Sequence, residues 1–86
     1  MPRISTFYGI VIMMFYNDHP PAHFHVKYGD HRARIEIDTL EYLTGKLPQR
    51  VRSLVMEWAT MHRGELRRNW ETAKEGKPLF QIDPLE

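Results

Sequence analysis

Two short segments of alternating side chains, His23–Tyr28 and Ala33–Asp38, constrain the fold of this chain more than any other feature of its sequence. Such alternation is typical of strands with one buried face, and the intervening Gly29-Asp30 pair is a two-residue hairpin signal. The resulting register sets Tyr28 opposite His31 and His23 opposite Glu36, with apolar side chains meeting on one face. The sequence therefore predicts an antiparallel hairpin at residues 23–38.

An apolar run at Phe7–Tyr16 precedes this hairpin. Its β-branched and aromatic content favours a single strand over a helix. Both alternating sets of the run are apolar, which predicts a strand covered on both faces. The prolines at positions 20 and 21 end it, since proline cannot donate to a strand ladder. After the hairpin, Thr39–Leu43 is expected to form a short extended piece, and Gly45 a turn.

The second half of the chain predicts one long helix that opens at Leu47-Pro48 and ends at Gly76-Lys77-Pro78. Its apolar residues recur at spacings of three and four, and Gly64 marks a place for a kink or a close contact. The tail Leu79–Ile82 is expected to add an edge strand or to lie across the sheet. The predicted fold is α+β: a three-stranded antiparallel meander, one long C-terminal helix and a short extended tail, in one domain spanning residues 1–86.

Composition excludes several classes of protein. The 86 residues contain no cysteine, which excludes a disulfide scaffold, a thiolate zinc site and a cysteine nucleophile. The formal net charge of +1 does not indicate a nucleic-acid binder by itself. No apolar run reaches the roughly 18 residues that a membrane span needs, so the expected location is the cytoplasm, with no membrane partner.

Histidines are concentrated in the run Asp18–His25. His23 and His25 project from one strand face and can share a divalent transition-metal ion such as zinc, with His19 from the preceding loop as a third ligand. Two alternatives stay open. The pair can serve proton transfer or anion binding, or His23 and His25 can be half-exposed strand residues that bond to Glu36 and to the backbone.

The same face of the predicted hairpin carries three cations, with Lys27 opposite Arg32 and Arg34 opposite His25. Like charges that face each other across a ladder are unfavourable unless they are solvated or neutralised by an anion. Lys27, Arg32 and Arg34 therefore predict a patch for phosphate or for an RNA backbone, and solvation alone is the alternative. If the patch belongs to an enzyme, His23 and His25 would transfer protons while Arg34 steadies phosphate charge.

A stripe along the predicted helix offers a partner interface. Its residues follow one another at helical spacings, and the alternative is that they form the core. A His62–Glu65 pair would also suit metal binding or proton transfer. One helix covers one sheet face, so the second apolar set of the first run needs another cover, for which a homodimer is the simplest supplier. The stripe comprises Trp58, His62, Glu65, Asn69 and Trp70.

The motifs Asp18-His-Pro-Pro-Ala-His-Phe-His-Val26 and Trp58-Ala-x-x-His62-x-x-Glu65-Leu-x-x-Asn69-Trp70 together resemble a small bacterial family of unknown function, numbered four-one-six-zero. The resemblance covers nearly the whole chain. Ala22 stands where members of that family commonly carry a third proline. Genes of the family often lie beside another small gene, an arrangement that resembles a toxin–antitoxin or co-regulated pair.

Three hypotheses follow. The first is a toxin–antitoxin-type module that binds a small protein from the neighbouring gene and RNA, as a ribonuclease if it is an enzyme. The second is a metal-binding domain or metal-dependent hydrolase that uses His19, His23 and His25. The third is a dimeric interaction module or transcriptional regulator without chemistry, although the sequence carries no recognisable helix-turn-helix.

Overall fold

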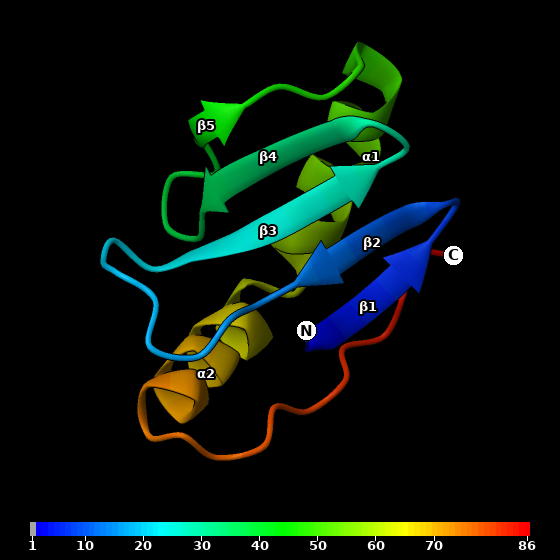
Figure 1. Ribbon diagram of the computed structural model, residues 1–86. Helices are drawn as coiled ribbons and strands as arrows, with labels where there is room; N and C mark the ends of the chain where they lie inside the picture. Colours follow the sequence, from blue (N-terminus) through cyan, green and yellow to red (C-terminus); the bar gives the residue numbers. More distant parts are fainter. Residues whose placement is uncertain (1) are drawn as a thin grey trace.

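The computed structural model describes residues 2–86 and consists of an antiparallel sheet with two helices packed against one of its faces (Figure 1). The five strands pair in sequence order, and each neighbouring pair is antiparallel. The predicted α+β class, with an antiparallel sheet followed by C-terminal helix, is confirmed. The predicted count of three strands and one helix is wrong. The elements are β1 Arg3–Phe7, β2 Ile10–Met13, β3 His23–Tyr28, β4 His31–Glu36, β5 Tyr42–Gly45, α1 Gln49–Met61 and α2 Arg63–Lys74.

The β3–β4 hairpin has the predicted register from His23↔Glu36 to Tyr28↔His31. Gly29 adopts a φ of +57°, as the first position of a tight two-residue hairpin loop requires. On the helix side, the apolar residues of both strands are buried to at least 97%. Alternation and the turn were sufficient here because each favours the same pairing. The buried residues are Phe24, Val26, Ala33 and Ile35.

The apolar run at Phe7–Tyr16 does not form the single strand predicted for it. It is split between β1 and β2, which form a second hairpin with Phe7 opposite Ile10. The loop residues Tyr8 and Gly9 have φ values of +51° and +77°, and a type I′ turn requires this pair of positive angles. A tyrosine is unusual at such a position. Because the residues on both sides of the turn are apolar, the hydrophobic pattern gave no sign of a turn there.

The last strand, β5, forms where an extended piece and a turn were predicted. Gly45 closes this strand with a φ of +76°, and a Cβ atom there would lie 2.0 Å from the carbonyl oxygen of Arg32. Only glycine allows that close approach, so β5 can pair with β4. The Tyr42 hydroxyl accepts a hydrogen bond from the Leu47 amide at 3.1 Å and so links β5 to the entry of α1.

The predicted long helix is interrupted at His62, which separates α1 from α2 with φ −119° and ψ 22°. Its amide is shared between the carbonyls of Trp58 and Ala59 at 3.1 and 3.2 Å. Gly64, where the sequence suggested a kink or close contact, lies two residues later in open space. The interruption lets Trp58 and Trp70 both face the core, with exposures of 0% and 6%.

The tail after α2 turns back from the end of that helix and runs along β1 (Figure 1), without forming a strand. The Ile82 amide donates to the carbonyl of Ile4 at 2.7 Å, and the Trp58 indole N–H donates to the carbonyl of Asp83 at 2.8 Å. Ile82 and Leu85 join the core. Within residues 2–86, neither helix combines the length and the apolar content that a membrane crossing requires.

Candidate functional site

The outer face of the sheet, opposite the helices, carries the polar side chains of β3 and β4. His25 and Lys27 alternate along β3 with the buried Phe24 and Val26. Arg34 and Arg32 face them from β4, and Met13 and Val11 face them from β2. We call this surface the outer face; it comprises Arg3, Val11, Met13, His25, Lys27, Arg32, Arg34 and Thr44.

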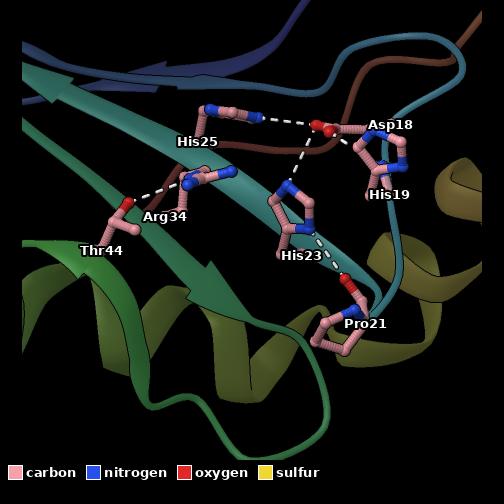
Figure 2. Close-up of polar contacts among 7 residues, drawn as sticks. All are labelled: Asp18, His19, Pro21, His23, His25, Arg34 and Thr44. Carbon is pink, nitrogen blue, oxygen red and sulfur yellow. Dashed lines mark hydrogen bonds and ion pairs between the residues drawn. The ribbon is translucent and has the colours of Figure 1, made fainter.

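At one end of the outer face, the β2–β3 loop brings Asp18 against two histidines (Figure 2). Oδ2 of Asp18 lies 3.0 Å from Nε2 of His23 and 2.9 Å from Nε2 of His25. One ligand atom from each of the three residues lies within 4.8 Å of the others. We call this group the Asp18–His23–His25 cluster.

His23 is the most buried member of the cluster, with 2% of its surface exposed. Its ring packs beside that of Trp70, with centroids 5.2 Å apart, because α2 reaches the end of β3. Nδ1 lies 2.7 Å from the carbonyl oxygen of Pro21. The sequence alternative of a half-exposed His23 bonded to Glu36 is therefore corrected: the backbone contact exists, but the carboxylate partner is Asp18.

His25 keeps 20% of its side chain exposed and lies at the open side of the cluster. Its ring packs against that of Phe15 in an edge-to-face arrangement, with centroids 4.3 Å apart. Burial lowers the pKa of His25 below its ordinary value of 6.5, and the charges of His23 and Arg34 add to this effect. The hydrogen bond and charge of Asp18 oppose the shift without reversing it. The neutral imidazole is therefore the favoured form at pH 7.

The carboxylate of Asp18 is ionised in this environment. Burial acts to raise its pKa, but the hydrogen bonds from His25 and from the His19 amide, together with the histidine charges, lower it below the ordinary value of 3.8. The His19 amide donates to Oδ1 at 3.0 Å, which leaves Oδ2 facing the two imidazoles. The cluster thus presents an anionic oxygen and two ring nitrogens around one point.

Asp18 was missed as a candidate ligand in the sequence, although it directly precedes the first histidine of the motif. His19, predicted as the third metal ligand, has an exposed side chain outside the cluster and contributes its backbone amide instead. Alternation could not have predicted that Asp18 replaces His19, because residues 17–22 form an irregular loop in which no period fixes the side-chain directions.

The cations of the outer face differ from those near the helices in their partners. Arg67 pairs with Asp38 at 2.7 Å, and Lys74 with Glu71 at 3.6 Å. In residues 2–86, no carboxylate lies within ion-pair distance of the four outer-face cations. Nε of Arg34 donates to Oγ1 of Thr44 at 2.9 Å, which holds the guanidinium beside His25 (Figure 2). The four cations are Arg3, Lys27, Arg32 and Arg34.

The helix stripe predicted as a partner interface lies largely inside the chain. Trp58 and Asn69 are fully buried, and Trp70 is 6% exposed. These side chains cover the inner sheet face and the tail, so they leave little area for a partner. His62 and Glu65 remain at the surface and contact each other, and within the described residues His62 is not part of the Asp18–His23–His25 cluster.

Comparison with known proteins gives one match. No curated protein and no solved structure shows significant similarity to the chain. A family model described as a domain of unknown function, DUF4160, matches residues 9–71. That span includes all three residues of the cluster and most of the outer face, and it covers well over half of the chain. The chain therefore belongs to the DUF4160 family.

Proposed function

We propose that this protein is the RNA-binding member of a toxin–antitoxin-type pair, and that its outer face binds the phosphate backbone of single-stranded RNA. The observation that carries the proposal is the set of outer-face cations without carboxylate partners. Lys27 and Arg32 are directly opposed across the β3–β4 ladder, and Arg34 is held beside them by Thr44. A bound polyanion relieves this repulsion, and its counterions are released.

The shape of the outer face supports a single strand as the ligand. Two adjacent shallow depressions cross it, and they share Met13 and Arg32 as lining residues. Arg3 and Lys27 line one depression, while Arg34 and Phe15 line the other. A cationic groove with an aromatic side chain at its edge is how sequence-tolerant proteins hold single strands, because the cations follow the backbone and an aromatic ring stacks on a base.

A second copy of the chain fits this face less well than RNA does. Val11 and Phe15 are only partly buried and offer apolar area to a partner. A two-fold interface on the same surface, however, would set Lys27 and Arg32 near their own copies, and the depression that they line holds three cations against one carboxylate, Asp30. Burying unpaired charges in this way is unfavourable. The homodimer inferred from sequence therefore competes with RNA for this face, and the charge balance favours RNA.

Fluorescence anisotropy with a labelled RNA of about a dozen nucleotides tests the proposal. Four phosphate contacts predict that the logarithm of the binding constant falls with the logarithm of salt concentration with a slope of about −3. Arg32→Gln should weaken binding and reduce the steepness of the slope by about 0.7. Arg67→Gln is the matched control, because Arg67 lies on α2 and pairs with Asp38. Binding that is absent, or equally weakened by the control, would overturn the proposal.

Growth measurements test the toxin–antitoxin part. Induced expression of the chain should arrest growth of a bacterial host, and co-expression of the small protein from the neighbouring gene should restore it. The double variant Lys27→Gln plus Arg32→Gln should not arrest growth if the outer face is responsible. Unimpaired growth with the wild-type chain, or arrest by the double variant at equal expression, contradicts this part.

A further inference from the structure

We propose that Asp18, His23 and His25 bind a divalent transition-metal ion, with zinc the best fit to the donor set. Oδ2 of Asp18 is within 3.0 Å of both Nε2 atoms, and one ligand atom from each of the three residues lies within 4.8 Å of the others. Tetrahedral zinc with ordinary bond lengths separates its ligand atoms by roughly 3.3 Å, so an expansion of a few tenths of an ångström admits the ion. The inference goes beyond RNA binding and does not depend on it.

The strongest observation is the state of the His23 ring. A carbonyl oxygen only accepts hydrogen bonds, so Nδ1 must carry the proton that it donates to Pro21 at 2.7 Å. In the neutral ring, Nε2 then has a lone pair and no proton, and it lies 3.0 Å from the anionic oxygen of Asp18. Nε2 is fully buried and has no hydrogen-bond partner. A cation between the two atoms turns this repulsion into coordination.

A doubly protonated His23 is the alternative, and the geometry disfavours it. An imidazolium would have to direct an N–H at Asp18, but the contact fails the angular requirements of a hydrogen bond, although it is short enough. It would also place a buried charge against the ring of Trp70. Charging two imidazoles that lie 5.1 Å apart is unfavourable.

The surroundings of the cluster have the features of an outer coordination shell. Histidines that ligate metals usually donate their other ring N–H to a backbone carbonyl or a carboxylate, and Pro21 supplies that carbonyl for His23. The His19 amide fixes Oδ1 of Asp18 and so aims Oδ2 at the imidazoles. The ring of Phe15 fixes the plane of His25. The ligands are therefore oriented before any ion arrives. His25 donates its Nε2 proton to Asp18 in the metal-free chain, so metal binding requires that this proton move to Nδ1 or leave to solvent.

Three protein ligands leave a tetrahedral ion one open position. A donor set of two histidines and one carboxylate with an open position is the arrangement of zinc sites that keep a water molecule. His25 lies on the solvent side of the cluster, opposite Arg34 in the ladder. The divalent ion and the guanidinium of Arg34 outweigh the single carboxylate of Asp18, so the site has a net positive charge. A ligand with an anionic oxygen therefore suits the fourth position.

Metal content and titration of untagged protein test the proposal. After removal of metal with a chelator, zinc should rebind at about one ion per chain, measured by isothermal titration and elemental analysis. His25→Gln and Asp18→Asn should each weaken zinc binding at least 10-fold. His19→Gln and Lys27→Gln are the controls, since one removes the exposed neighbouring imidazole and the other a cation needed for RNA alone. Unchanged affinity in His25→Gln, or less than a tenth of an ion per wild-type chain, would overturn the site.

Tryptophan fluorescence supplies a second readout that reports on His23 itself. Cobalt added to the metal-free protein should quench the emission of Trp70, whose ring lies 5.2 Å from that of His23. Trp70→Phe should remove this quenching, while Trp58 still reports that the chain is folded. Circular dichroism of the metal-free variants identifies any variant that fails to fold. His25→Gln is expected to fold, because the His25 side chain is partly exposed. Quenching in Trp70→Phe as strong as in the wild type would place the ion elsewhere and refute the proposal.

Discussion

Phe24 and His25 are adjacent in the chain and lie on opposite faces of β3, where they experience different surroundings. Phe24 is fully buried against Trp58, with ring centroids 6.1 Å apart. His25 faces outward beside Asp18 and Arg34, partly in water. The inner face is apolar and closed by both helices, whereas the outer face gathers cations and imidazoles without a covering layer in residues 2–86. Stability thus resides mainly on one face, and candidate chemistry on the other.

The largest expected effect is the contrast between those two neighbours. Phe24→Ala should lower the free energy of unfolding by about 3–5 kcal/mol, because it leaves a cavity beneath α1. His25→Ala should lower it by only roughly 1 kcal/mol in metal-free protein, through the lost hydrogen bond to Asp18. Urea denaturation in the presence of a chelator measures both. Equal losses for the two variants would contradict the separation of the faces.

A second test concerns the one buried amide of the helix layer. Asn69 is fully buried and bonds twice to the backbone of Phe80, donating at 2.9 Å and accepting at 3.1 Å. Asn69→Leu should lower the free energy of unfolding by about 2–3 kcal/mol, because both backbone groups of the tail lose their partner. Thr72→Ala on the same helix should change it by less than about 0.5 kcal/mol. A loss in Thr72→Ala as large as in Asn69→Leu would show that the tail is held otherwise.

Charge removal on the outer face should have a small effect of the opposite sign. Lys27→Gln should raise the free energy of unfolding by up to about 0.5 kcal/mol at low salt, because it ends the opposition to Arg32. Arg67→Gln, which breaks the exposed pair with Asp38, should lower it by a similar amount. Thermal denaturation at two salt concentrations measures both changes. A destabilised Lys27→Gln would mean that this cation has a stabilising partner.

The smallest expected effect is a pH dependence confined to the outer face. The pKa of His25 is lower in the folded chain than its ordinary value of 6.5, so the unfolded chain binds more protons below that value. Stability should therefore be complete above about pH 6.5 and decline as the pH falls below it. The lowered pKa of Asp18 continues the decline below pH 3.8. Denaturation midpoints of metal-free wild type and His25→Gln measure the first step, which should be reduced in the variant.

Local pattern determined the parts of the fold in which the local signals agreed with one another. The β3–β4 register followed from alternation and one glycine turn, and the antiparallel class followed from that hairpin. The same reasoning missed the β1–β2 hairpin, because its turn residues Tyr8 and Gly9 lie in a continuous apolar run that masks the boundary. It also missed the interruption at His62, since the apolar spacing continues through it. At the first place a single glycine was too weak a signal within the apolar run, and at the second the predicted kink at Gly64 lies two residues after the actual interruption.

The sequence by itself placed His23 and His25 on one face of a strand, with Lys27, Arg32 and Arg34 beside them, because a strand has a fixed period of two. Only the tertiary structure decided that Asp18, rather than His19, faces the two imidazoles. The loop at residues 17–22 has no period, and its path depends on contacts with residues far away in the sequence, including the hydrogen bond from the Ile37 amide to the carbonyl of Ala22. The same packing decided that Trp58, Asn69 and Trp70 serve the core, since the extra hairpin and the tail supply the surface that buries them.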